Sequence, residues 1–494
     1  MKSAALALSI LLMISFLAAC GEGAAPAAPA ETDPVSETAP GEGGTGATDT
    51  DARVPYDTSG IDYGGYTFRV WNYDAYTEGT WDRNAIPEDL YAESLTGEVL
   101  NDAVFNRNKA VEEALDITIY VEDRIGGDMS EGVRKAVTAG SDDVDLIFPR
   151  QYDFAGMVTG AYLLDLASLD SISRGAGWWN GKANDAMIIR GKSFGMYSDI
   201  SYFDKLSTIV TFFNQKLAAD YQLGDMYELV GNNQWTMDRL LEIGAPLSAD
   251  INGDGAYDMS DSYPLACQND AVYYFLHGAN LRICTVDSGG SVVFSLDDQT
   301  TVSVLQKIYD IMADSTKFLN RQSFNATLYD AINMFCENRN MFLVRPLQSL
   351  FQMRNMEADF GILPTPKMLE NQQSYGTAVN PYAGTIMSMP MSVADPERSA
   401  KIADVLAWES HYTVIDPLYE NVLGNKLIRD EGAKKMLTIV FDSVVCDVGV
   451  IFNFADITST IISYKQNDVV SMIEKQKSKV EAQIDKLNEV IDGI

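Results

Sequence analysis

Residues 117–148 read ITIYVEDRIGGDMSEGVRKAVTAGSDDVDLIF. This stretch begins with an alternating apolar segment, Ile117–Val121, and ends with a continuous apolar run, Val144–Phe148. The first pattern predicts a strand, and the second predicts a buried strand. Between them, Met129–Ala139 has the apolar spacing of a helix. A strand, a helix and a strand in this order predict a parallel sheet with crossover helices.

The same pattern extends toward the N-terminus. Tyr66–Trp71 alternates after two glycines and predicts a first strand, and Glu98–Leu115 predicts an amphipathic helix. We therefore expect an α/β fold. Ligands of such sheets bind beyond the carboxyl ends of the strands. This rule places residues 71–74 and 150–153 at the mouth of a cleft.

The composition argues against several classes of function. The chain has 70 acidic and 36 basic residues and a formal net charge of −34. Nucleic acid and anionic lipid headgroups bind basic patches, so neither is expected as a ligand. The two histidines argue against a His-ligated metal site or a Ser-His-Asp triad, and no glycine-rich nucleotide motif is present. Residues 63–494 are long enough to form two lobes.

The N-terminus resembles that of a bacterial lipoprotein. The apolar run from Ala4 is too short to span a membrane, and it ends in Leu17-Ala18-Ala19-Cys20, which looks like a lipobox. We expect a signal peptide over residues 1–19 and a lipid anchor on Cys20, which holds the chain at the extracellular face of the bacterial cell membrane. The alternative is an ordinary signal peptide with a chance cysteine. Residues 20–62 are predicted to form a disordered linker, because they carry few large apolar side chains.

The remaining cysteines have no CxxC spacing, which argues against a zinc or redox motif. A Cys267–Cys284 bridge would close a short loop outside the cell, whereas free buried thiols are the alternative. Both alternatives stay open. These cysteines are Cys267, Cys284, Cys336 and Cys446.

Five segments of the folded part follow one another in a characteristic order and spacing. They are Asp145–Leu166, Gly191–Tyr197 with Ile209–Leu217, Leu328–Pro346, Phe360–Pro366, and Ala383–Met389 with Ser399–Trp408. Together they resemble the extracellular solute-binding proteins of ABC importers, in particular the maltose-binding type. The resemblance implies a two-lobed periplasmic-binding-protein (Venus flytrap) fold with hinge crossovers. It assigns residues 63–197 and 335–382 to lobe 1, and residues 198–334 and 383–494 to lobe 2.

The resemblance also implies individual ligand contacts. Tyr152 and Asp153, next to Arg150, match sugar contacts after the third strand. Arg345 and Leu347 match contacts after the returning strand. The maltose-binding type often has an aromatic residue at the position of Leu347, so this departure weakens the transfer of maltodextrin specificity to this chain. Further candidate contacts are Tyr197 and Asp199 after the first crossing, Tyr382 before the last crossing, and Trp71 and Tyr73 at the end of the first strand.

This residue set suits sugars. A sugar ring stacks an apolar face on an aromatic side chain, and its hydroxyls bond to carboxylates, Asn and Arg. Each aromatic residue can instead serve packing, as we expect for Trp235 before the helix cap Thr236. Aromatic residues near the expected cleft are Trp71, Tyr73, Tyr76, Trp81, Trp178 and Trp179.

Residues 250–261, DINGDGAYDMSD, match an EF-hand loop. A glycine stands at position six, as the tight turn of such a loop requires. We expect a structural calcium ion there, bound weakly because the last ligand is Asp rather than Glu. The alternative is an acidic turn without an ion. The expected ligands are Asp250, Asn252, Asp254, the carbonyl of Ala256, Asp258 and Asp261.

These features predict a binding protein and not an enzyme. It would capture a carbohydrate, such as an oligosaccharide, and deliver it to the permease subunits of an ABC transporter. One alternative is a surface-tethered glycoside hydrolase, because paired carboxylates are abundant. Another is a glycan-binding protein that works without a permease. At the C-terminus, Val469–Ile491 predicts an amphipathic helix that packs on the second lobe.

Overall fold

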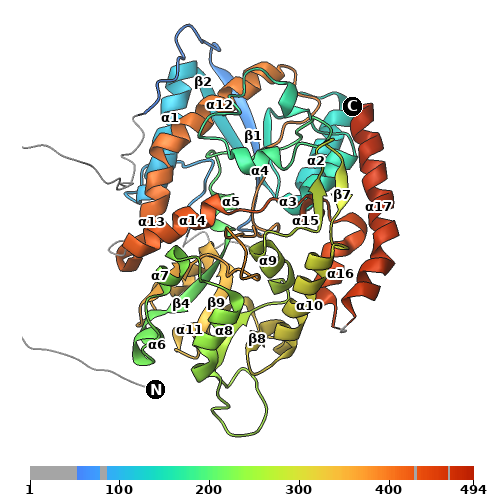
Figure 1. Ribbon diagram of the computed structural model, residues 1–494. Coiled ribbons are helices and arrows are strands. Elements are labelled where there is room, and N and C mark those ends of the chain that lie inside the picture. The colour runs from blue at the N-terminus through green and yellow to red at the C-terminus, as the bar shows by residue number, and fades with distance from the viewer. Residues whose placement is uncertain (1–52, 78–85, 428–430, 466–467) are drawn as a thin grey trace, which may run out of the picture. The chain divides into compact units, whose positions relative to one another are not determined.

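The first sheet contains three parallel strands, β1 (Tyr66–Tyr73), β2 (Ile117–Arg124) and β3 (Leu146–Phe148), in the order β2-β1-β3 (Figure 1). Helices α1 (Val99–Leu115) and α2 (Gly126–Ala139) connect the strands. The predicted strand–helix–strand–helix–strand unit is therefore confirmed. The next helix is α3 (Gln151–Thr159), followed by the short α4 (Gly181–Asp185).

The computed structural model describes residues 53–77, 86–427, 431–465 and 468–494. One compact unit spans Pro55–Ile494. The predicted signal peptide, Cys20, most of the predicted linker and Trp81 lie outside the described residues. Among the helices within them, none is long and apolar enough to cross a membrane.

The second sheet has five strands in the order β10-β4-β9-β5-β8. β5 runs parallel to β8 and β9, whereas β4 is antiparallel to β9 and β10. Trp235 is fully buried behind this sheet and donates its Nε1–H to the Pro364 carbonyl at 2.9 Å, so its predicted packing role is confirmed. The strands are β4 (Ile209–Asn214), β5 (Tyr263–Cys267), β8 (Phe318–Asn320), β9 (Asn340–Pro346) and β10 (Phe360–Leu363); the separate hairpin is β6 (Cys284–Val286) and β7 (Val292–Phe294).

We call the second sheet and its helices the second lobe. Helices follow most of the strands of this sheet. The side chain of Thr236 accepts a hydrogen bond from the Arg239 N–H, which confirms it as the N-cap of α8. The helices are α5 (Phe203–Leu206), α6 (Gln215–Asp220), α7 (Met226–Gly231), α8 (Met237–Gly244), α9 (Ala271–Gly278), α10 (Gln299–Ala313) and α11 (Leu328–Cys336).

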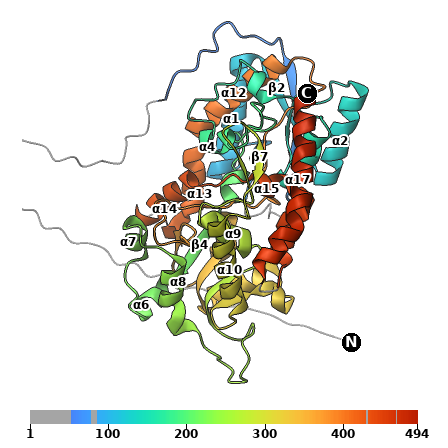
Figure 2. The same cartoon turned by 45° about the vertical axis from the view of Figure 1, so that its right-hand side comes forward.

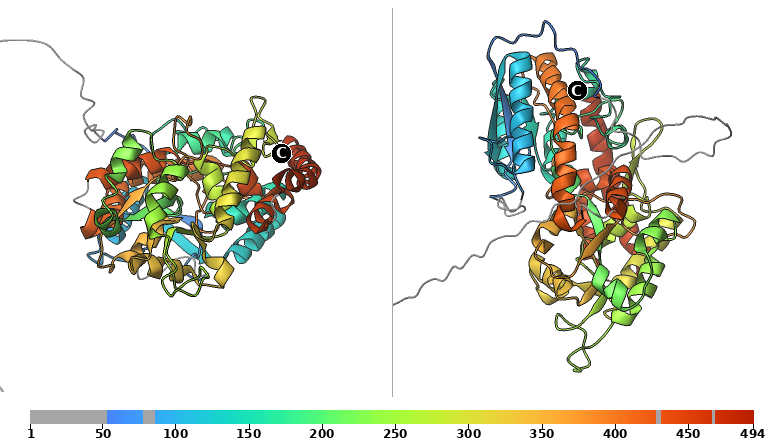
Figure 3. Two further views of the ribbon diagram at one scale, coloured as in Figure 1. Left: turned by 60° about the horizontal axis from the view of Figure 1, so that its bottom comes forward. Right: turned by 90° about the vertical axis from the view of Figure 1, so that its left-hand side faces the viewer.

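The lobe assignment of two segments is corrected by the sheet topology. β9 and β10 pair with β4 in the second sheet, so residues 335–382 do not re-enter lobe 1. Residues 385–390 instead bridge to the first lobe, for example Ser388 to Ile147. Helix α12 (Pro396–Thr413) then packs on α1 (Figure 3). The apolar pattern of β9 predicts a buried strand, but only the backbone pairing shows which sheet contains it.

The C-terminal helices contact both lobes. α15 lies against α3 and β6, and α17 lies against α10 and β7 (Figure 2). Helix α17 buries the apolar side chains that predicted it, from Val469 to Ile491. The predicted C-terminal helix is confirmed. These elements are α13 (Ile415–Leu427), α14 (Glu431–Asp442), α15 (Val448–Phe452), α16 (Ile457–Ser463) and α17 (Val469–Gly493).

Residues 55–62 belong to the folded unit, contrary to the predicted linker that ends at residue 62. The Tyr56 ring packs against Trp178 and Trp408, and its hydroxyl donates to Asp404 at 2.7 Å. Buried Asp404 also accepts the indole N–H groups of Trp178 at 3.0 Å and Trp179 at 2.7 Å. These contacts, together with the packing of Ile61 on the same core, hold this segment on the first lobe.

The four cysteines other than Cys20 are free thiols. Cys267, Cys284 and Cys446 are buried, and Cys336 is partly buried. The sequence left open a Cys267–Cys284 disulfide or free thiols, and the structure contains free thiols.

Candidate functional site

The carboxyl ends of the parallel strands carry most of the candidate residues. In the first lobe, β3 ends at Phe148 and α3 begins at Gln151. In the second lobe, residues 268–270 lie between β5 and α9. Strands β8 and β9 run parallel to β5, so they end at the same edge of that sheet. Polar side chains from separate strands therefore gather at each edge.

Two tyrosines form the exposed aromatic surface of the site. The rings of Tyr152 and Tyr382 stack with centroids 5.0 Å apart and an interplanar angle of 29°. Their side chains are 48% and 40% exposed. Partial burial raises the pKa of Tyr382, and the charge of Asp270 adds to this effect. Tyr382 therefore lies within electrostatic range of the second lobe while it stacks on the first.

An ion pair lies beside the stacked tyrosines. Nε of Arg150 donates to Oδ2 of Asp153 at 2.5 Å. The Arg150 guanidinium lies 5.5 Å from the Tyr152 ring centroid and 5.3 Å from that of Tyr73. The first-lobe part of the site thus offers hydrogen-bonding groups of both charges with no net charge.

The second-lobe part is an arginine cluster of four residues, namely Gln268, Asp270, Arg321 and Arg345. Oε1 of Gln268 accepts hydrogen bonds from Nη1 of Arg345 at 2.5 Å and from Nη2 and Nε of Arg321 at 3.0 and 3.2 Å. The Gln268 amide nitrogen donates to Oδ2 of Asp270. Burial raises the pKa of Asp270, although both arginines oppose that shift.

The structure brings five of the predicted ligand contacts to these edges. Arg150, Tyr152 and Asp153 lie at the first edge, where Tyr382 stacks on Tyr152, and Arg345 lies at the second edge. Gln268, Asp270 and Arg321 were not predicted. Residues 268–270 directly follow a strand, so the rule used for the first sheet would have found two of them. Arg321 follows β8, whose three residues are too few for a strand pattern.

Three predicted contacts are instead buried, which corrects their assignment. Leu347 is fully buried, and its N–H donates to the Thr208 carbonyl at 2.9 Å. Tyr73 is also fully buried. Trp71 is 6% exposed, and the guanidinium of Arg124 covers its ring at 3.7 Å from the centroid. In this arrangement the rings of Tyr73 and Trp71 and the side chain of Leu347 offer no face to a ligand.

Asp199 and Tyr197 also serve other contacts. Asp199 forms an ion pair with Nζ of Lys205 at 2.8 Å, and its other oxygen forms a hydrogen bond with Nδ1 of His411 at 2.7 Å. Burial disfavours its charged form, but these two partners hold the pKa of Asp199 below its usual value. Tyr197 is buried, and burial raises its pKa well above the usual value.

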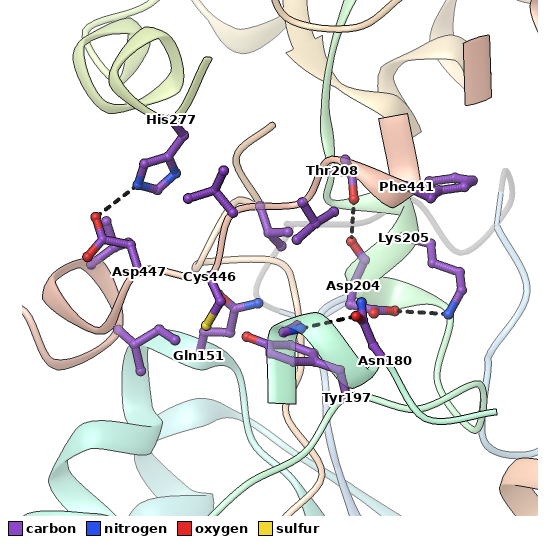
Figure 4. Close-up of a pocket in the computed structure, with 16 residues that line it drawn as sticks. Gln151, Asn180, Tyr197, Asp204, Lys205, Thr208, His277, Phe441, Cys446 and Asp447 are labelled. Carbon is purple, nitrogen blue, oxygen red and sulfur yellow. Dashed lines mark hydrogen bonds and ion pairs between the residues drawn. The ribbon is translucent and has the colours of Figure 1, made fainter. Parts of the chain in front are cut away.

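Tyr197 lines a partly open cavity with about 60 Å³ of water-accessible space (Figure 4). Both lobes contribute to its wall, with Gln151 from α3 and His277 from α9. His277 bonds through Nε2 to the buried Asp447 at 2.9 Å.

The predicted calcium loop lies between α8 and β5. Its carboxylates accept backbone N–H groups of the same loop, as Asp250 does from Gly253 at 2.7 Å and Gly255 at 2.8 Å. Asp261 is fully buried and accepts from Ile251 at 2.9 Å. Within the described ranges, no three His, Cys, Asp or Glu side chains are grouped so that they could hold a metal ion. Calcium binding at this loop therefore stays a prediction.

Solved structures share this fold along most of the chain. The galacto-N-biose/lacto-N-biose I-binding protein of the Bifidobacterium longum ABC transporter aligns with a TM-score of 0.57 and 12% identity, covering 85% of this chain and 98% of that one. The ABC substrate-binding protein Lmo0181 of Listeria monocytogenes, solved with cycloalternan, aligns with a TM-score of 0.52 and 12% identity, covering 87% of this chain and 99% of that one. The maltose/maltodextrin-binding domain MalE of Bdellovibrio bacteriovorus, bound to maltotriose, aligns with a TM-score of 0.51 and 14% identity, covering 85% of this chain and 99% of that one.

These likenesses concern the fold. The chain has the two-lobed α/β fold of periplasmic binding proteins, as the resemblance implied. No family model and no curated protein sequence matches the chain.

Proposed function

We propose that the protein captures a carbohydrate between its two lobes and delivers it to the permease of an ABC transporter, without a catalytic step. The observation that carries this proposal is the stacked pair Tyr152 and Tyr382, half-exposed at the strand ends where ligands of this fold class bind. Exposed rings of this kind offer the flat apolar surface on which a pyranose ring stacks.

The polar neighbours of this pair support the proposal. Arg150 pairs with Asp153 beside Tyr152, and the charge of Asp270, which belongs to the same cluster as Arg345, acts on Tyr382. Arginine and carboxylate groups bind vicinal hydroxyls in pairs, and charged partners strengthen these hydrogen bonds. The similar solved structures, which contain sugar ligands or belong to ABC transporters, give further support.

The N-terminal sequence supports an anchored receptor. A lipid on Cys20 would hold the protein at the outer face of the membrane, and the acidic segment after it would act as a tether. Tethering raises the effective concentration of a receptor near its permease. Capture and delivery then take place at the same membrane surface.

Ligand-dependent closure tests this function. Calorimetry with a panel of neutral and acidic oligosaccharides should identify a binding sugar, and small-angle scattering should show a smaller radius of gyration with that sugar bound. Closure requires contacts that the open form lacks, so binding and compaction should saturate together. Absence of both across the panel would refute the proposal. New reducing ends released from the bound sugar would favour the tethered hydrolase instead.

A further inference from the structure

The arginine cluster holds more positive charge than its own residues balance. It contains two guanidinium groups, Arg321 and Arg345, and one carboxyl group, Asp270. In the described part of the chain, every hydrogen bond of the two arginines goes to a neutral oxygen, either Oε1 of Gln268 or the Ala326 carbonyl. This local excess stands out in a chain with a formal net charge of −34.

The donors of the cluster also outnumber its acceptors. Three N–H groups converge on Oε1 of Gln268, although an amide oxygen has two lone pairs. Nε of Arg345 is buried and has no hydrogen-bond partner among the residues that the structure describes. A buried donor without a partner carries a desolvation cost that a ligand oxygen would remove.

The two guanidinium groups also repel each other. Burial and the neighbouring Arg345 lower the pKa of Arg321. Like charges held together in a partly buried site are unfavourable unless an anion joins them. The Gln268 side chain keeps this arrangement in place, because its nitrogen is engaged with Asp270 and its oxygen therefore faces the arginines.

We propose that the captured sugar carries a carboxylate, and that Arg321 and Arg345 bind this group while the sugar ring lies on Tyr152 and Tyr382. The inference rests on the proposed function and names the substrate class, namely a uronic-acid-containing oligosaccharide. Arginine suits a carboxylate because its planar fork of N–H groups matches the two oxygens. The neutral Arg150–Asp153 pair on the first lobe remains available for hydroxyls.

Calorimetry on the full chain with matched sugars tests this inference. The probes are maltotriose, cellotriose and β-1,4-galactotriose, each compared with its C6-oxidised uronate and its C6-sulfate. We expect at least one uronate to bind about tenfold or more tightly than its neutral counterpart, the value typical of one charge-assisted hydrogen bond. This preference should shrink between 20 and 200 mM salt, whereas neutral binding should not change.

Variants assign the preference to the cluster. Arg321→Gln should remove most of the uronate preference and change neutral binding less than about threefold, whereas Arg321→Lys should retain part of it through its charge. Arg345→Gln should act in the same way. Because Arg345 is buried and this variant can unfold, Arg321→Gln alone is decisive. The control is Arg282→Gln, since Arg282 bonds to the Cys446 carbonyl outside the cluster.

The outcomes separate the two proposals. Tighter binding of a neutral sugar than of its uronate, or an equal loss of both in Arg321→Gln, would overturn the inference and leave sugar capture intact. Tighter binding of the sulfates than of the uronates would overturn the assignment to a carboxylate. If none of the nine sugars binds or compacts the protein, the proposed function fails and this inference fails with it.

Discussion

At the scale of single residues, Asp89 is the most perturbed carboxyl group outside the ligand site. It is fully buried, and its Oδ2 accepts a hydrogen bond from Ser201, while Oδ1 has no partner within the described residues. Burial raises the pKa of Asp89 to about 7, despite the nearby positive charge of Arg107. Ser201 in turn bonds to Thr385 at 3.0 Å, so Asp89 belongs to a contact between two chain crossings.

This shift predicts a pH-dependent stability. The folded-state pKa lies above the unfolded value of 3.8, so the stabilisation from protonated Asp89 is complete below that value and is lost as the pH rises through about 7. Between pH 5 and pH 8 we expect Asp89 to lower the free energy of unfolding by roughly 3 kcal/mol at most, at about 1.4 kcal/mol for each pKa unit.

Urea unfolding of Asp89→Asn at both pH values measures this effect. The variant should lose less stability than the native protein between pH 5 and pH 8. Asp143→Asn, a change at an exposed carboxylate, should follow the native profile. Parallel profiles for Asp89→Asn and the native protein would contradict the prediction.

Tyr382 provides a second test at this scale. Tyr382→Ala removes one ring of the stacked pair, and we expect sugar affinity to fall roughly tenfold, or about 1.4 kcal/mol. Tyr382→Phe keeps the ring and should retain most of the affinity. Tyr221→Ala, which removes a tyrosine that is 46% exposed elsewhere, serves as the control in the same calorimetry. Unchanged affinity in Tyr382→Ala would argue against stacking on this pair.

Among the elements, the loop over residues 250–261 combines five acidic or amide side chains with glycine at the EF-hand position. Calcium would have to draw carboxylate oxygens away from backbone N–H groups such as Gly255. We predict that 10 mM calcium raises the unfolding midpoint and that magnesium does not. With an affinity of about 1 mM, the gain is roughly 1.4 kcal/mol.

Differential scanning fluorimetry of Asp254→Asn checks this prediction. The substitution should weaken the calcium effect, because an amide oxygen carries less negative charge than a carboxylate oxygen, and Asp220→Asn, at a carboxylate outside the loop, should preserve it. An equal calcium effect in native protein and Asp254→Asn would place the ion elsewhere.

Helix α17 is held by a buried apolar stripe rather than by its exposed charges. Ile484 is 4% exposed and lies in the middle of this stripe. Ile484→Ala should destabilise the protein by roughly 2–4 kcal/mol, because it leaves a cavity in a packed interface. Val470→Ala on the same helix, at a side chain that is 51% exposed, should change stability by less than about 0.5 kcal/mol. Similar losses in both variants, measured by urea unfolding, would contradict this account.

For the whole molecule, the central question is attachment to the membrane. We expect Cys20→Ser to move the protein from the membrane fraction to the medium, because the acyl chains on Cys20 would supply its binding energy. Cys336→Ser, at a partly buried thiol of the folded unit, should leave the protein in the membrane fraction. Retention of Cys20→Ser at the membrane would refute lipid anchoring through this cysteine.

The local elements of this protein follow from the amino-acid sequence alone. The first parallel unit, the cap at Thr236 and the buried face of α17 were all predictable, because hydrophobic periodicity and capping depend on residues a few positions apart. The strand-end rule also located Arg150, Tyr152 and Asp153, since it needs only the position at which a strand ends.

Only the tertiary structure decided which sheet each strand joins and which side chains meet. β9 and β10 pair with β4 in the second sheet, a choice that a mostly apolar strand does not encode locally. The arginine cluster joins residues from the ends of three strands, and Tyr382 meets Tyr152 from more than 200 positions away. Such contacts depend on the register and packing of distant segments, which leave no periodic trace in the sequence.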